Sequence, residues 1–238
     1  MLPSTALPHL EETIDATTRY LAAVDELDDE AMRAPSLLSG WTRGHVVTHL
    51  ARHADAFSHA LHGVLNDADA WMYSSQDDRN AAIEKGAGRS AADLWEDSAA
   101  SWGRLLQTFN ELHPRHLDLT ISRVPGGEPF LPVREMPERR RTEVEVHHAD
   151  LGIGYTPADW PVAFAVSVIG RRQDELGLDG PSMVLSSTDV DGLWKLGAGQ
   201  GPEIKGAAGD LAWWLLGRGD GAGLVSSTAE LPQLGKWR

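Results

Sequence analysis

The sequence predicts an α + α/β protein, with an N-terminal four-helix bundle followed by a small C-terminal α/β domain. In the first part of the chain, four long segments are expected to be helical, and apolar residues recur at helical spacing in three of them. The segment GIGYTPADWP, at residues 152–161, then breaks this periodicity with glycine and proline. After it, short segments have the composition and period of β-strands. We therefore expect a bundle over residues 1–154 and an α/β domain over residues 160–238.

Three of the predicted helices of the bundle have an apolar stripe, and the fourth carries Glu143 and His147 on one side. The helices are expected over residues 8–33, 40–57, 90–112 and 132–150. Thr42 and Ser90 stand where an N-cap is needed, and a Ser or Thr there accepts a hydrogen bond from a free backbone N–H. Four such helices favour an antiparallel bundle. The polar and aromatic stretch 67–88 is expected to be a long connection that covers a site, and residues 117–130 are expected to be extended.

The C-terminal domain is expected to contain both helices and strands. Helices are expected over residues 162–177 and 208–216. The sequences SMVLSST and GLWKLG are expected to form strands joined by a turn at residues 189–192. Residues 201–205 are a candidate third strand.

The composition excludes several classes of function. The net charge is −14 at pH 7, which disfavours nucleic acids and anionic membranes as partners. The chain has no Cys, so any thiol chemistry would need a thiol from outside the protein. No segment has the apolar length that crosses a bilayer, and the first residues lack the features of a signal peptide. We expect a cytoplasmic protein, and a monomer, that acts on small molecules.

Two helices carry side chains at the spacing of metal ligands. Glu143 and His147 are four residues apart, so one helix face presents a carboxylate and an imidazole about 6 Å apart. The second helix carries His45, His49 and His53, also at steps of four. One of these His residues would complete a set of three protein ligands, which leaves one position of a catalytic zinc open. A solvated helix face and a plain polar stripe remain the alternatives at this point.

Other motifs are weaker. GRGDGAG, at residues 217–223, follows a predicted helix rather than a strand, so it lacks the context of a dinucleotide-binding loop. It is either a flexible turn or a loop that presents Arg218 to a carboxylate or a sugar. Trp213 and Trp214 are expected in the core and at the interface between the domains rather than as a stacking platform. The run of Arg residues at 139–141 is expected on a solvated face. No G-x-S-x-G sequence supports a hydrolase.

Four motifs occur in order along the chain. They are GWTRGHVVTHLARHAD, MYSSQDDRNAAIEKG, EVEVHHADLG and GRGDGAGLVSST. Together they resemble the mycothiol-dependent maleylpyruvate isomerase family, whose first domain is similar to the DinB four-helix bundle. The resemblance implies a zinc ion held by His49, Glu143 and His147, and it thereby selects one His from the three of the second helix.

The resemblance also implies roles for residues outside the metal set. Arg218 and Arg79 would be catalytic, and Asn80 and Arg218 would bind the cofactor. The implied cofactors are zinc and mycothiol, and the implied partner is a small anionic substrate. Glu145 and His148 are expected to add polarity beside the ligands, which leaves the exact substrate open.

The implied reaction is the cis–trans isomerisation of maleylpyruvate to fumarylpyruvate, in gentisate-type aromatic degradation. Zinc would lower the pKa of the mycothiol thiol. The thiolate would add to the cis double bond, the bond would rotate, and elimination would return the thiol. Two alternatives stay open: a mycothiol S-transferase that uses the same thiolate on another electrophile, and a metal- or ligand-binding protein without turnover.

Overall fold

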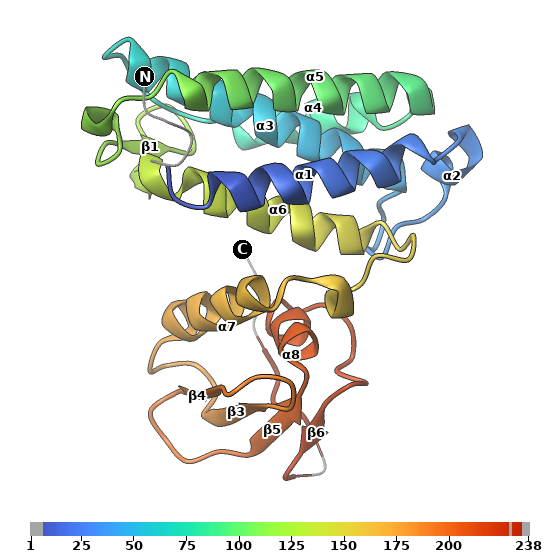
Figure 1. Ribbon diagram of the computed structural model, residues 1–238, viewed down its shortest axis with the longest axis vertical. Helices are drawn as coiled ribbons and strands as arrows, with labels where there is room; N and C mark the ends of the chain where they lie inside the picture. Colours follow the sequence, from blue (N-terminus) through green and yellow to red (C-terminus); the bar gives the residue numbers. More distant parts are fainter. Residues whose placement is uncertain (1–6, 229, 235–238) are drawn as a thin grey trace. The chain divides into compact units, whose positions relative to one another are not determined.

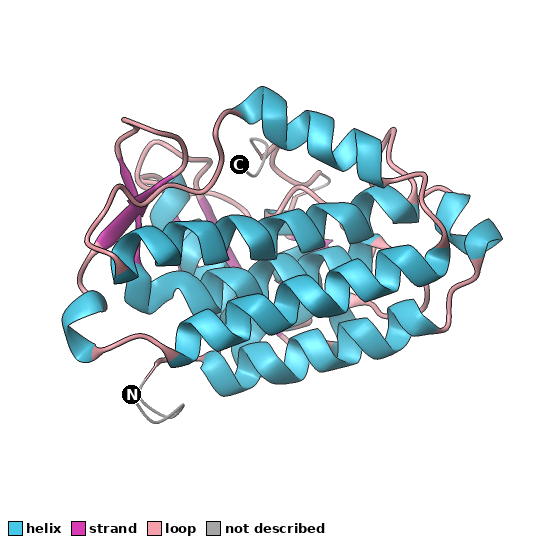
Figure 2. Cartoon of the chain, turned by 90° about the horizontal axis from the view of Figure 1, so that it is seen from above, coloured by secondary structure: helices cyan, strands magenta, loops and turns pink. Residues whose placement is uncertain are grey.

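The structure is a computed structural model that describes residues 7–228 and 230–234. The chain forms two compact units that divide between Ile153 and Gly154. The first is a helical bundle and the second is a small α/β unit, so the fold class predicted from the sequence is confirmed. Helices make up most of the chain (Figure 2). Among the described residues, no helix is both long enough and apolar enough to span a membrane.

Four long helices run side by side in the first unit (Figure 1). They are α1 (Leu10–Asp25), α3 (Arg43–Leu65), α5 (Ala91–Asn110) and α6 (Met136–Asp150). Helix α3 packs against α5 and α6, and α1 packs against α6 and α5. Thr42 begins α3 and Ser90 begins α5 as predicted, because each side chain accepts a hydrogen bond from a backbone N–H three residues further on.

Two predicted helix boundaries were wrong. The segment 8–33 is divided into α1 and the short α2 (Asp29–Arg33), because Asp28 has extended backbone and caps α2 by accepting from the N–H of Ala31. Helix α3 continues beyond residue 57, because further buried residues extend its apolar stripe. These residues are Ala60, Leu61 and Val64.

The connection between α3 and α5 is not entirely irregular. It contains α4 (Gln76–Gly86), and Ser75 caps this helix by accepting a hydrogen bond from the N–H of Asp78. The stretch after α5 is extended as predicted, and β1 (Thr120–Ser122) pairs with β2 (Pro129–Pro132) in an antiparallel hairpin. Helix α4 packs against α3, so the connection covers one side of that helix.

Helix α6 buries charged residues. Arg140 is 2% exposed and Arg141 is 5% exposed, so the predicted solvated face at these positions is wrong. The physical reason is that α6 packs against both α1 and α3. Its polar side chains therefore point into the bundle as well as away from it.

The second unit is a four-stranded sheet with two helices. The strand order is β4-β3-β5-β6, with β3 and β5 parallel and the other pairs antiparallel. The elements are α7 (Val162–Leu176), β3 (Met183–Ser187), β4 (Leu193–Leu196), β5 (Glu203–Gly206), α8 (Ala208–Leu215) and β6 (Val225–Ser226). The third strand expected from the sequence is present as β5, and the short edge strand β6 was not predicted.

Candidate metal centre

Three side chains from two helices meet inside the bundle. His49 comes from α3, and Glu143 and His147 come from α6. Oε2 of Glu143 lies 3.1 Å from Nε2 of His49 and 3.6 Å from Nε2 of His147. One ligand atom from each residue lies within 4.8 Å of the other two, so the three could hold a metal ion. The side chains are 4%, 12% and 8% exposed in chain order, which leaves Glu143 the most accessible.

The other two His residues of α3 are used differently. His45 completes the N-cap of α3, because its Nδ1 accepts a hydrogen bond from the Thr42 N–H at 3.2 Å. Its Nε2 lies 3.3 Å from a carboxylate oxygen of Glu84. His53 is buried, and its Nδ1 lies 3.4 Å from the Arg140 guanidinium. Neither residue belongs to the group of three.

Two residues expected beside the ligands face a different helix. Glu145 is buried and forms an ion pair with Arg19 of α1 at 2.7 Å. The His148 ring lies 5.9 Å from the ring of Tyr20, also on α1. Each of these two side chains therefore contacts a residue of α1, and their effect on the choice of substrate stays a prediction.

A buried carboxylate orients His147, and the sequence analysis missed it. Asp150 is fully buried, and its Oδ2 lies 2.9 Å from Nδ1 of His147. A carboxylate behind a ligand His fixes the ring and places the free lone pair on the opposite nitrogen. The available signal was the spacing of three residues on one helix, His-x-x-Asp, which brings the two side chains to the same face.

Arg79 reaches the centre from α4. Its Nη2 donates a hydrogen bond to Nδ1 of His49 at 3.2 Å. Its Nη1 donates to the amide oxygen of Asn80 at 3.1 Å, and Asn80 itself is exposed. Of the two pocket residues implied by the resemblance, Arg79 touches a ligand of the centre and Asn80 contacts Arg79.

The electrostatics of the three ligands differ. Burial lowers the pKa of His49 to about 4, despite its hydrogen bond to Glu143. Burial also lowers the pKa of His147, but hydrogen bonds to Asp150 and Glu143 outweigh it and raise the pKa to about 9. Burial disfavours ionised Glu143, yet the surrounding imidazoles hold its pKa well below the usual value. At neutral pH the metal-free centre therefore holds a neutral His49, an ionised Glu143 and a protonated His147.

Arg218 lies in the second unit, just after α8. Gly217 and Gly219 on either side have φ of 69° and 65°, a conformation that favours glycine. The backbone N–H of Arg218 donates to the carbonyl of Trp213 at 3.1 Å. The Trp213 ring is half-buried and lies 5.8 Å from the ring of Trp160. Participation of Arg218 in the centre stays a prediction.

The bundle and the centre define a class of protein. Two His and one carboxylate, held by facing helices, form a candidate metal centre, and three protein ligands leave one position of a tetrahedral zinc open. A family model described as the mycothiol maleylpyruvate isomerase N-terminal domain matches residues 14–152, and the chain belongs to this family. The resemblance seen in the sequence is thereby confirmed.

Two solved structures are similar over the full length of the chain. A crystal structure of the mycothiol-dependent maleylpyruvate isomerase has 25% sequence identity and a TM-score of 0.88, and the match covers 100% of both chains. A crystal structure of that isomerase with one His replaced by Ala has 24% identity, a TM-score of 0.88 and the same coverage. No curated protein matches the chain. The family and these structures identify the protein as a member of an enzyme family.

Proposed function

We propose that the protein is a zinc- and mycothiol-dependent isomerase that converts maleylpyruvate to fumarylpyruvate. The observation that carries this proposal is the centre formed by His49, Glu143 and His147 in a chain of this family. The absence of Cys supports the need for an external thiol, because the chain offers no sulfur nucleophile of its own.

The donor atoms of the centre suit zinc. Ligands at 2.0–2.1 Å from a tetrahedral zinc lie about 3.4 Å from one another. The separations of 3.1 Å and 3.6 Å from Glu143 Oε2 to the two imidazole nitrogens agree with this value. The Asp150 contact at Nδ1 of His147 leaves Nε2 of that ring as the donor toward the centre.

Zinc held here would lower the pKa of a thiol placed at its open position. In the proposed reaction, the mycothiol thiolate forms a C–S bond at the cis double bond. The displaced electron pair is delocalised onto the neighbouring carbonyl oxygen. The former double bond rotates as a single bond. The electron pair then returns, the C–S bond breaks, and the trans product and the thiolate leave with no net gain or loss of atoms.

Arg79 is suited to hold a substrate carboxylate in this reaction. Its hydrogen bond to His49 requires Nδ1 to accept, because a guanidinium only donates. Coordination through Nε2 would place the ring proton on Nδ1, where Arg79 can no longer bind. Metal loading would therefore release the Nη2 group, which can then bind a carboxylate. Asn80 accepts from Nη1 and would hold the guanidinium during this change.

Arg218 is the second anion-binding residue of the proposal. Arg218 is partly buried, and the positive φ of the glycines on either side forms a tight turn at this position. A guanidinium can bind a carboxylate bidentately and stabilise the negative charge that develops on the enolate oxygen. Its role in catalysis, and that of Asn80 in cofactor binding, rest on the resemblance of the motifs that contain them.

The test is an assay of maleylpyruvate with zinc-loaded protein, with and without mycothiol. Ultraviolet absorbance follows the substrate, and chromatography identifies the product. Formation of fumarylpyruvate only in the presence of mycothiol, with the thiol recovered, supports the isomerase. Consumption of the thiol without fumarylpyruvate would replace it with an S-transferase. No change in either compound would leave a binding protein and refute the proposal.

A further inference from the structure

Two arginine side chains share one aromatic ring near the start of α6. The guanidinium carbon of Arg123 lies 4.7 Å from the centroid of the Phe130 ring, and that of Arg139 lies 5.9 Å from it. Arg123 follows strand β1, Phe130 belongs to β2, and Arg139 belongs to α6. Phe130 packs against the hydrophobic core of the bundle, so its ring is an anchored platform that gathers two cations. We call these three residues the arginine cluster.

The two cations of the arginine cluster are not neutralised by acidic groups. Within the part of the chain that the structure describes, neither guanidinium forms an ion pair with a carboxylate. Arg139 also lies in the first turn of α6, where the helix macrodipole favours negative charge. The acid of this turn, Glu138, faces Arg141 at 3.7 Å. The cluster is therefore a local excess of positive charge in a chain whose net charge is −14, and an anion would relieve the repulsion within it.

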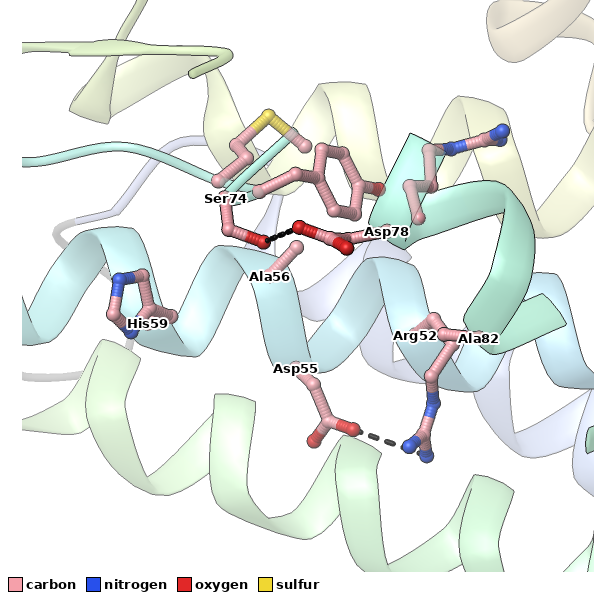
Figure 3. Close-up of a pocket in the computed structure, with 10 residues that line it drawn as sticks. Arg52, Asp55, Ala56, His59, Ser74, Asp78 and Ala82 are labelled. Carbon is pink, nitrogen blue, oxygen red and sulfur yellow. Dashed lines mark hydrogen bonds and ion pairs between the residues drawn. The ribbon is translucent and has the colours of Figure 1, made fainter. Parts of the chain in front are cut away.

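The charged side chains of a cavity on the same side of the bundle are paired, in contrast. This cavity has a volume of about 320 Å³ and is lined by residues of α3, α4 and the segment between them. In it the Ser74 hydroxyl donates to Asp78 at 2.6 Å, and Arg52 forms an ion pair with Asp55 at 3.0 Å (Figure 3). An anion would therefore gain less from the cation of Arg52 than from the arginine cluster.

The arginine cluster lies close to the metal centre by two routes. Arg139 and Glu143 are four residues apart, so they share one side of α6, and a step of four residues advances a helix by about 6 Å. The second route runs through Tyr73, whose backbone N–H donates to the Arg123 carbonyl at 3.0 Å. The Tyr73 ring lies 5.8 Å from the guanidinium carbon of Arg79, the residue that reaches the centre from α4. A ligand that spans about one helical turn could therefore touch both the cluster and the centre.

We propose that the arginine cluster is an anion-binding site for the far carboxylate of a dicarboxylate whose near end lies at the metal centre. Guanidinium groups bind carboxylates through paired hydrogen bonds, and a carboxylate has about four lone-pair sites, enough to accept from both arginines. A monocarboxylate cannot occupy the centre and the cluster at once, so the cluster selects dicarboxylates. The place of the near end rests on the proposed function, whereas the anion site rests on the two arginines.

Two substitutions and a control test the arginine cluster. Arg123→Gln and Arg139→Gln each remove one cation. Arg134→Gln is the control, because Arg134 is exposed in the same segment and pairs with Asp118. Calorimetry of the zinc-loaded protein uses adipate, a six-carbon dicarboxylate, and hexanoate, the monocarboxylate of the same length. We expect the wild type and Arg134→Gln to bind adipate at least about tenfold more tightly than hexanoate, and each cluster variant to reduce this ratio to about twofold or less.

Kinetics should show that the cluster binds the substrate without taking part in the chemistry. In Arg139→Gln the KM for maleylpyruvate should rise about tenfold or more, while kcat stays within about twofold, because the lost contact is equal in the ground state and the transition state. The zinc content and the KM for mycothiol should match those of Arg134→Gln. A fall in kcat at unchanged KM, or the same ratio of adipate to hexanoate affinity in Arg139→Gln and Arg134→Gln, would overturn the inference.

The binding measurement separates this inference from the proposed function, because it does not depend on turnover. If Arg139→Gln fails to fold, Arg123→Gln decides the question, since Arg123 is exposed after β1. A preference for adipate that is lost in the cluster variants, in a protein that never isomerises maleylpyruvate, would refute the proposed function alone. An active isomerase that binds adipate and hexanoate equally would refute this inference alone.

Discussion

Replacing Asp150 with Asn should weaken zinc binding, and the loss should depend on pH. Asp150 and His147 are both buried, and their side chains are 2.9 Å apart. A hydrogen bond to a charged group contributes about 1.5–3 kcal/mol, and loss of a carboxylate behind a ligand His costs about 10–100-fold in metal affinity. The substitution keeps the shape of the side chain and removes its charge, so the fold should survive.

The pH dependence follows from competition with a proton. In the metal-free wild type the pKa of His147 is about 9, so zinc must displace a proton from this ring at neutral pH. Asn at position 150 should lower that pKa and weaken the competition. The variant should therefore bind zinc about 10–100-fold more weakly above pH 9, with a smaller difference near pH 7.

Competition with a chromophoric chelator measures this affinity at each pH. Asp97→Asn is the control, because Asp97 pairs with Arg52 and Arg89 away from the centre. It should lower stability and leave zinc affinity unchanged. Equal zinc affinity of the wild type and Asp150→Asn above pH 9 would refute a role for Asp150. A loss that is the same at every pH would show that Asp150 does not act through the basicity of His147.

Four further predictions follow from the centre and its surroundings. His49→Ala should lose zinc by elemental analysis while His53→Ala retains it; the reverse result would move the ligand assignment along α3. Arg79→Met should bind zinc about 2–10-fold more tightly, because the hydrogen bond that competes with coordination is gone, yet kcat/KM should fall; unchanged zinc affinity would contradict the proposed release. Arg218→Ala should keep its zinc and lose about 10–100-fold in kcat/KM. Arg218→Lys should restore only part of this loss, because an ammonium lacks the planar fork of a guanidinium. Wild-type kinetics in Arg218→Ala would remove Arg218 from the site. In the metal-free protein, His147 should stabilise the fold fully below its unfolded pKa of 6.5 and lose this contribution as pH rises through about 9. Denaturant unfolding should show that the difference in free energy of unfolding between the wild type and His147→Gln shrinks over that pH range.

The sequence could predict half of the centre from spacing alone. Glu143 and His147 share a face because a four-residue step turns a helix by only about 40°. The same rule cannot choose among His45, His49 and His53, because all three lie within about 80° on α3. The choice depends on which one points at α6, and that is a property of packing. The resemblance to a family supplied His49, and the structure places this residue in the group of three.

Other parts of the centre depend on contacts that spacing does not encode. Arg79 reaches His49 from α4, which lies in a stretch that we expected from the sequence to be a long connection. Glu145 and His148 neighbour the ligands in sequence and yet face α1. Which side of α6 meets which neighbour could not be read from an apolar stripe, because polar residues occupy all sides of this helix.

Because polar residues occupy all sides of α6, the sequence also wrongly predicts a solvated face for its run of Arg residues. Arg140 is 2% exposed, and its guanidinium donates to the Leu50 carbonyl at 2.8 Å. Burial lowers its pKa to about 10, while attraction to Tyr20 and Glu143 works in the opposite direction. An apolar residue at such a position would often be as stable or more stable. Arg140 is a buried cation three residues before Glu143, so the rule that charged side chains lie on the surface fails close to the candidate ligands. Such a departure is expected at a functional site. Assigning polar residues to the surface fails on α6 because this helix packs against both α1 and α3, so that charged side chains such as Arg140 and Glu145 are buried.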